Sequence, residues 1–157
     1  MFIRMLAIFA LLPTMLLASA APAQESKVPY WASISAPEVY MRVGPSRNYP
    51  VEWVYAREGL PVKVLRVNQG WRYVEDPDGA RGWMFSAMLS RKRGAIVVGD
   101  TLAPIRAQPD ETSALKWNAE PGVVGAIGEC AGGWCEFEAG GRAGWMPAAR
   151  LWGVGDP

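Results

Sequence analysis

The chain has 157 residues, half of them hydrophobic, with 16 Lys/Arg and 15 Asp/Glu and a formal net charge of +1. This balance argues against nucleic acid or an anionic membrane as the main partner, because both reward a strong positive field. The chain contains no histidine, which excludes Ser-His-Asp and Cys-His nucleophile systems and histidine-ligated metals. We therefore expect no cofactor and no metal.

The chain begins with an apolar stretch. Arg4 precedes an apolar run from Met5 to Ala18, and residues 21–23 read Ala-Pro-Ala, which fits a cleavage site of the A-x-A type. The run is shorter than the roughly 20 residues that a membrane span needs. We predict a signal peptide over residues 1–23, a flexible lead-in over residues 24–29 and a mature protein in the periplasm or secreted, with no membrane span. A retained N-terminal anchor is the alternative.

Two copies of one unit follow the lead-in. Trp53, Trp71 and Trp83 recur as Trp117, Trp134 and Trp145, at spacings of 64, 63 and 62 residues. The spacing shrinks by one residue in each interval, as shortened turns would produce. Internal repeats of this kind mark repeated structural units. We predict two domains, over residues 30–92 and 94–154.

Each unit shows strand patterns separated by turns. Residues 60–67 alternate apolar and polar with a period of two, and residues 71–75 alternate again. The tetrapeptide Asp-Pro-Asp-Gly over residues 76–79 is a strong turn. An extended segment follows, and residues 86–88 then predict one tight helical turn before a short last strand. Many short strands of this kind favour an all-β fold built as a small barrel or sandwich.

Tryptophan is unusually frequent, with eight copies. A unit of about 60 residues has little core volume, and each buried aromatic contributes roughly 150–250 Å² of buried surface. We therefore expect the four tryptophans on the hairpin strands to pack as part of the scaffold: Trp71, Trp83, Trp134 and Trp145. Trp53 and Trp117 follow the long first loop, where each could serve as a core lid or as a ligand platform.

Short motifs recur around these strands. The stretch "YMRVGPSRNYP" over residues 40–50 is followed by Gly-Trp, by Asp-Gly and by Gly-Trp-Met, with a leucine six residues past the last tryptophan. Residues 103–113 carry a weaker form of the first motif. The whole series resembles the bacterial Src-homology-3-like domain, present as two tandem copies. The resemblance implies a five-stranded, strongly bent β-barrel in each unit and a binding or targeting role toward cell-wall peptides or protein partners, with no catalytic residues.

The chain has two cysteines, Cys130 and Cys135. In the alignment of the two units they take the places of Val67 and Arg72, which we expect to face each other across a hairpin. Opposite positions lie within disulfide reach, and an exported compartment favours oxidation. We predict a structural disulfide. A redox-active pair and free thiols are the alternatives.

The first loop differs between the two units. The first unit has three tyrosines around this loop, whereas the second unit has Pro104, Ser113 and Ala119 at the matching positions. A scaffold requirement should act on both units alike, so residues present in one unit only are freer to serve a site. We hypothesise a ligand groove on the first unit that is lined by Tyr40, Tyr49, Trp53 and Tyr55, with Arg47 offering charge. The alternative is that these tyrosines simply cover a larger loop.

These patterns predict a non-catalytic exported binding or targeting module for a cell-wall peptide or a periplasmic protein, with the first unit as the binder. The alternative is a structural or interaction protein. Residues 30–93 carry ten basic and six acidic residues and residues 94–157 carry four and eight, so the halves have net charges of +4 and −4 and could dock on each other or between chains. An enzyme is not expected, because Glu136 and Glu138 read as solvated positions of an ordinary strand.

Overall fold

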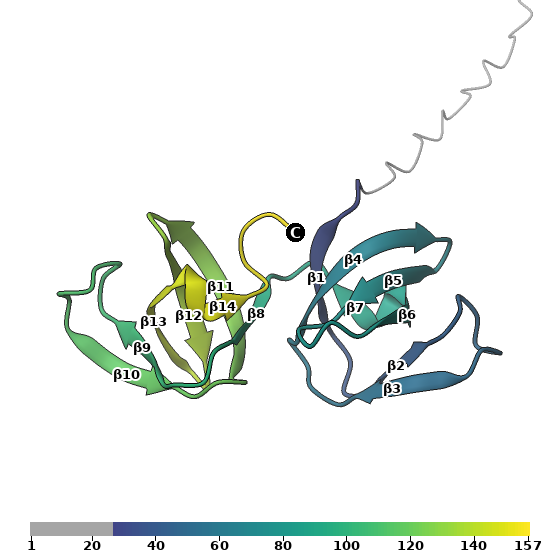
Figure 1. The fold of residues 1–157 in the computed structure, drawn as a ribbon, viewed down its shortest axis with the longest axis horizontal. Helices are drawn as coiled ribbons and strands as arrows, with labels where there is room; N and C mark the ends of the chain where they lie inside the picture. Colours follow the sequence, from purple (N-terminus) through teal and green to yellow (C-terminus); the bar gives the residue numbers. More distant parts are fainter. Residues whose placement is uncertain (1–26) are drawn as a thin grey trace, which may run out of the picture.

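The computed structural model describes residues 27–157, and Figure 1 shows them as two small β-structures joined in tandem. The predicted signal peptide and the start of the predicted lead-in lie outside the described residues. The described chain is all-β, with two sheets of seven strands and two single turns of 3-10 helix. No helix in this part of the chain is long and apolar enough to cross a membrane.

The first barrel is an antiparallel sheet with the strand order β3-β2-β6-β5-β4-β1-β7. Its elements are β1 (Tyr30–Ile34), β2 (Val39–Arg42), β3 (Val51–Tyr55), β4 (Pro61–Asn68), β5 (Trp71–Glu75), β6 (Arg81–Phe85), the 3-10 turn η1 (Ser86–Met88) and β7 (Leu89–Ser90). The predicted strands and the predicted helical turn are confirmed. The alternating pattern of β4 buries Val62 and Val64 completely, as expected for a strand with one face on a core.

The second barrel repeats this order as β10-β9-β13-β12-β11-β8-β14. Its elements are β8 (Gly94–Val97), β9 (Ala103–Arg106), β10 (Leu115–Ala119), β11 (Val124–Ala131), β12 (Trp134–Ala139), β13 (Arg142–Pro147), the 3-10 turn η2 (Ala148–Arg150) and β14 (Leu151–Trp152). Each element of the first barrel has a counterpart here. The predicted fold of two tandem barrels is therefore confirmed.

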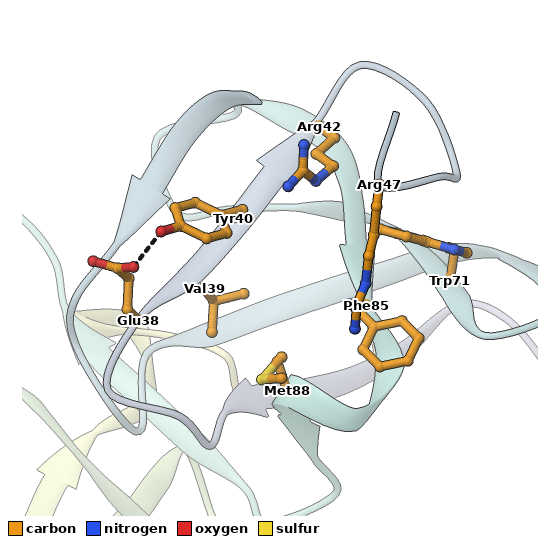
Figure 2. Close-up of a pocket in the computed structure, with 8 residues that line it drawn as sticks. All are labelled: Glu38, Val39, Tyr40, Arg42, Arg47, Trp71, Phe85 and Met88. Carbon is orange, nitrogen blue, oxygen red and sulfur yellow. Dashed lines mark hydrogen bonds between the residues drawn. The ribbon is translucent and has the colours of Figure 1, made fainter. Parts of the chain in front are cut away.

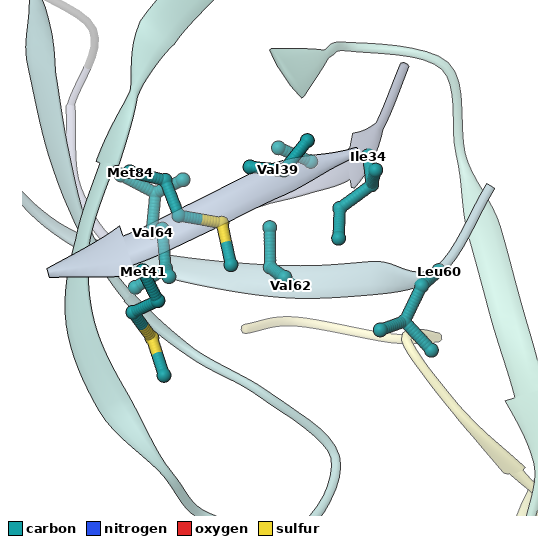
Figure 3. Close-up of a cluster of buried hydrophobic side chains, with 9 residues drawn as sticks. Ile34, Val39, Met41, Leu60, Val62, Val64 and Met84 are labelled. Atoms are coloured by element: carbon teal, nitrogen blue, oxygen red, sulfur yellow. The ribbon is translucent and has the colours of Figure 1, made fainter. Parts of the chain in front are cut away.

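The repeated Gly-Trp-Met phrase places methionine, rather than tryptophan, in the core. Met84 and Met146 are fully buried, whereas Trp83 and Trp145 are only partly buried, and no tryptophan is among the fully buried residues of either described core. Figure 3 shows Met84 among the apolar side chains of the first core. These tryptophans lie beside the cores and not in them, because strand alternation turns the residue between two inward positions outward.

The glycine of the Gly-Trp-Met phrase is required for a different reason, the close approach of two strands. A Cβ atom on Gly82 would lie 2.5 Å from the side chain of Met41 and 2.9 Å from the carbonyl oxygen of Arg42. Strands β6 and β2 therefore approach each other more closely than any larger residue would permit. The same constraint applies in the second barrel, where a Cβ on Gly144 would lie 2.6 Å from Ile105.

The two barrels touch through aromatic and backbone groups. The rings of Trp31 and Trp152 lie 4.8 Å apart, edge to face. The indole N–H of Trp31 donates to the carbonyl of Gly155, and the Arg57 guanidinium donates to the carbonyl of Gly122. Both ion pairs of the described residues lie inside the first barrel. The contact between the barrels therefore uses no pair of opposite charges.

Candidate functional site

A pocket of about 260 Å³ opens on the first barrel. Figure 2 shows the eight residues that line it: Glu38, Val39, Tyr40, Arg42, Arg47, Trp71, Phe85 and Met88. They come from β2 and its flanks, from the loop after β2, from the start of β5, from the end of β6 and from η1. The pocket therefore lies where three strands, one loop and the helical turn meet.

The pocket combines an apolar floor with cationic walls. The Phe85 ring lies 5.5 Å from the Trp71 ring, and the Arg47 guanidinium lies 5.5 Å from the centre of the Phe85 ring. Arg42 lies 5.6 Å from the centre of the Tyr40 ring. Cations over aromatic faces are attracted by the ring quadrupole, so the Tyr40 and Phe85 rings each hold an arginine of the pocket lining.

Tyr40 is held by its neighbour Glu38. The phenol O–H donates to the Glu38 carboxylate, and this hydrogen bond raises the pKa of Tyr40 above its ordinary value. Tyr40 therefore stays neutral at physiological pH. The ring remains 43% exposed, which leaves an aromatic surface available to a ligand.

The structure brings two of the five predicted groove residues to this pocket, namely Tyr40 and Arg47. In the β2–β3 hairpin, Tyr40 lies opposite Val54 and Met41 lies opposite Trp53. Opposed residues share a face of the sheet, and successive residues alternate between faces. Trp53 and Tyr55 therefore point to the other face from Tyr40, and the predicted set does not form one groove.

Tyr55 supports the fold of the first barrel. Its ring packs against the core, and its O–H donates to the Asp76 carboxylate at 2.8 Å. Burial, followed by this hydrogen bond, raises the pKa of Tyr55. The Asp76 carboxylate also accepts the backbone N–H groups of Asp78 and Ala80, at 3.0 and 2.8 Å. Tyr55 thus ties β3 to the turn that the Asp-Pro-Asp-Gly motif predicted.

Tyr49 covers the loop after β2. A Cβ on Gly44 would lie 2.5 Å from the Tyr49 ring, so the ring rests on the glycine backbone. The carbonyl of Tyr49 accepts a hydrogen bond of 2.7 Å from Arg42. Trp53, the fifth predicted residue, lies on β3 with 55% of its surface exposed. Neither side chain lines the pocket.

Sequence reasoning missed most of the pocket lining. Glu38, Trp71, Phe85 and Met88 all contribute to it. The alignment of the two units contains this signal: Phe85 corresponds to Pro147 and Met88 corresponds to Arg150, so neither residue is shared by the two units. Both positions lie outside the first loop, where the aromatic difference between the two units is largest.

The predicted disulfide is present in the second barrel. Cys130 and Cys135 are bonded, with their Cα atoms 4.1 Å apart. They lie opposite each other on β11 and β12, as Val67 and Arg72 do on β4 and β5. The disulfide therefore staples the hairpin that corresponds to β4–β5, far from the pocket lining.

A sequence model of the bacterial SH3 domain matches residues 35–91 and 99–153, one match in each barrel. The chain belongs to the bacterial SH3 domain family. This confirms the resemblance that the motifs suggested. Domains of this family are generally binding modules and are often associated with the cell wall. From here on, the two barrels are called the first and second SH3 domains.

Two solved structures are similar to the chain, both from Trichomonas vaginalis. The NlpC2 structure is 15% identical over 82% of this chain and 49% of its own, with a TM-score of 0.36. The NlpC1 structure is 16% identical over 89% of this chain and 50% of its own, with a TM-score of 0.34. The chain thus spans about half the length of these two proteins. A search of curated protein sequences gives no match.

Proposed function

We propose that this protein is an exported, non-catalytic binding module whose first SH3 domain takes a peptide in the pocket of Figure 2. The peptide belongs to the cell wall or to a periplasmic protein. One observation carries the proposal: Tyr40, Arg47 and Phe85 of the pocket lining are replaced at the matching positions of the second SH3 domain, which keeps only the counterparts of Arg42 and Trp71 among the aromatic and basic lining residues. Family membership supports the binding role.

The two domains carry different residues at four positions of the pocket lining. Four lining residues of the first domain, Tyr40, Arg47, Phe85 and Met88, are matched in the second domain by Pro104, Glu111, Pro147 and Arg150. The strand register supports this alignment, because Trp71 lies opposite Phe85 and Trp134 lies opposite Pro147. The second barrel folds without these four residues. The fold therefore does not require them, and they are free to contact a ligand.

The lining indicates the chemistry of the ligand. The apolar floor formed by Val39, Phe85 and Met88 suits an apolar side chain. Arg47 is exposed and takes part in neither ion pair of the described residues. A planar guanidinium pairs well with a carboxylate. We therefore propose a peptide that places an apolar group in the pocket and a carboxylate beside Arg47.

The location follows from two features. The N-terminal pattern of residues 1–23 supports export, and the Cys130–Cys135 disulfide suits an oxidising compartment. We propose that the mature protein resides in the periplasm or is secreted. In either place it can reach cell-wall peptides directly.

Sedimentation with purified peptidoglycan tests the proposal. Arg47→Glu copies the residue that the second domain carries, and we expect it to weaken retention by roughly tenfold or more, since it replaces an attraction by a repulsion. The matched control is Glu111→Arg in the second domain, which should leave retention unchanged. Retention that both variants leave intact would exclude this pocket as the site.

A crosslinking pull-down from the exported fraction separates the two ligand sources. If the wild type fails to sediment with peptidoglycan, the cell-wall source is excluded. A protein that crosslinks to the wild type and is lost in Arg47→Glu would then identify a periplasmic partner. Failure of both experiments would overturn the proposed function.

A further inference from the structure

A second hollow, of about 360 Å³, lies on the second SH3 domain. Most of its lining comes from β11, β12 and β13, which are neighbours in the sheet (Figure 1). Glu136 and Glu138 share the exposed face of β12, and Trp145 lies directly opposite Glu136 on β13. The hollow therefore places a half-buried aromatic ring beside two carboxylates.

In the first SH3 domain, an arginine of the chain itself covers the matching tryptophan. Trp83 corresponds to Trp145 and lies opposite Tyr73. The Arg66 guanidinium lies 4.1 Å from the centre of the Tyr73 ring and 5.6 Å from the centre of the Trp83 ring. In the second domain, Glu129 stands at the position of Arg66. The cation that covers this face in one domain is thus replaced by a carboxylate in the other.

The glutamate that both domains share on this face has also lost its cationic partners. In the first domain, Glu75 pairs with Lys63 at 3.7 Å and with Arg81 at 2.6 Å. Glu138 is its counterpart, and the two cations become alanines in the second domain: Ala126 replaces Lys63, and Ala143 replaces Arg81. The strand register supports this alignment, because Glu138 lies opposite both alanines as Glu75 lies opposite both cations.

The remaining basic residue of the hollow does not fill the vacated place. Lys116 is the one basic residue among those that line it, and its ammonium donates to the carbonyl of Ala143. Both ion pairs of the described residues belong to the first domain, so Lys116 pairs with neither Glu136 nor Glu138. The same ring and the same glutamate that hold cations in the first domain are thus left to a cation from outside.

The Glu136 carboxylate is held in place by the neighbouring strand. A Cβ on Gly128 would lie 2.5 Å from a carboxylate oxygen of Glu136, and the same oxygen accepts the backbone N–H of Glu129 at 3.4 Å. The disulfide joins the residues next in the chain, since Cys130 follows Glu129 and Cys135 precedes Glu136. A carboxylate that is already positioned loses less conformational freedom when it binds a ligand.

We propose that this hollow binds an arginine side chain of a polypeptide partner, with its guanidinium over Trp145 and beside Glu136 and Glu138. The guanidinium of the partner would take the place that Arg66 takes in the first domain. A planar guanidinium suits both parts of the site, because it stacks on aromatic faces and pairs with carboxylates. The net charge of −4 on residues 94–157 also attracts a basic partner. This site goes beyond the proposed function and stands without it.

NMR titration of the mature full chain tests the site, with N-acetyl-arginine amide as the probe at up to about 50 mM. We expect saturable shifts centred on the Trp145 indole and on β12, with a Kd on the order of 5 mM, because a single exposed side-chain contact is weak. N-acetyl-citrulline amide has nearly the same shape without the charge and should bind at least about fivefold more weakly. Equal binding of both probes, or no saturable shift at Trp145, would overturn the proposal.

A substitution that copies the first domain should close the site from within. Glu129→Arg restores the arginine that Arg66 supplies there, and it should weaken binding of the arginine probe by roughly tenfold. The matched control is Glu111→Arg, which makes the same charge change in the loop after β9, outside the lining of the hollow, and should bind the probe like the wild type. Equal weakening by the two variants would reduce the effect to overall charge and overturn the site.

The carboxylates have their own test. The double variant Glu136→Gln with Glu138→Gln keeps the shape of the hollow and should weaken the arginine probe by about fivefold or more. Unchanged binding would contradict their role. All these substitutions fall on exposed side chains, and thermal unfolding checks that each variant is folded.

A lysine probe tests the preference for arginine. N-acetyl-lysine amide should bind a few-fold more weakly than the arginine probe, because an ammonium does not stack on the ring as a planar group does. Equal or tighter binding of lysine would overturn the assignment to arginine. Arg47→Glu, which lies in the pocket of the first domain, should leave the shifts at Trp145 unchanged. Failure of this site and failure of the proposed function are therefore distinguishable.

Discussion

Both SH3 domains fix their first loop in the same way. Arg42 donates to the carbonyl of Tyr49, and Arg106 donates to the carbonyl of Ser113, each at 2.7 Å. The surfaces around these identical bonds differ. The first domain has an aromatic pocket, whereas the second has a disulfide and an arginine over the Trp117 ring.

This contrast separates scaffold from function inside one chain. What the two domains share, such as the inward methionine and the arginine of the loop, is what the barrel needs to close. What they do not share is free to vary with the task of each domain. The second domain, which has the disulfide and lacks the counterparts of Tyr40, Arg47 and Phe85, acts as a control for the first. Substitutions in matched pairs can test each assignment.

The largest expected effect falls on a shared position. Met84→Ala and Met146→Ala should each lower the free energy of unfolding of their own domain by about 3 kcal/mol, because both side chains are completely buried and truncation leaves a cavity. Urea unfolding followed by domain-resolved amide exchange measures both. Met88→Ala, at a partly buried position, should cost less. A negligible effect at Met146 would contradict the assignment of methionine as a shared core residue.

The disulfide should give an effect in one domain only. Replacing Cys130 and Cys135 together by alanine should lower the free energy of unfolding of the second domain by about 2 kcal/mol, because the closed loop is short. The same measurement should show the first domain unchanged. Peptidoglycan retention should also be unaffected, since the bond lies outside the pocket. Loss of retention in this variant would argue that the second domain takes part in binding.

The fold could be predicted well from the sequence alone, because the patterns that define it involve residues close together in the chain. The period-two pattern of residues 60–67 defines strand β4, and the ordered drift of the tryptophan spacing defines two copies. The alignment of the two units also predicts that Cys130 lies opposite Cys135, as it does in the β11–β12 hairpin. Strand alternation and turns are determined by residues that are neighbours in the sequence. They can therefore be predicted from the sequence and are found in the folded protein.

The site was harder to predict because it depends on which face each residue takes. Tyr40 and Trp53 both belong to the β2–β3 hairpin, yet alternation sends them to opposite faces. Phe85 and Met88 reach the pocket from about 45 residues further along the chain. Long-range proximity of this kind leaves no periodic trace in the sequence. Strand position also decides the burial of the Gly-Trp-Met phrase, in which methionine points into the core and the larger tryptophan stays partly buried.

A smaller difference between the domains should come from Tyr55. Ala119 takes its place in the second domain, so the bond to Asp76 exists in the first domain only. Tyr55→Phe removes that bond and should cost the first domain about 1 kcal/mol. Tyr49→Phe is the control, because the Tyr49 ring is exposed and its loop bond uses the backbone. Urea unfolding at neutral pH measures both variants.

The pH dependence of Tyr55 sharpens this comparison. Its pKa is raised in the folded state by burial and by the bond to Asp76, so the unfolded chain loses this proton first as pH rises. The stabilisation is therefore fully present below about pH 10 and is lost above it. Unfolding at about pH 9 and about pH 11 should show the wild type losing more stability than Tyr55→Phe. Equal losses would contradict the shift.

The smallest expected effect concerns the Trp117 ring of the second domain. Arg142→Ala removes the cation over Trp117 and should lower the stability of that domain by about 0.5 kcal/mol. The Trp117 ring should then be more accessible to a fluorescence quencher. Arg142→Lys keeps a charge but loses the planar stack, so it should fall between the wild type and alanine. An unchanged quenching of Trp117 would mean that Arg142 does not cover the ring.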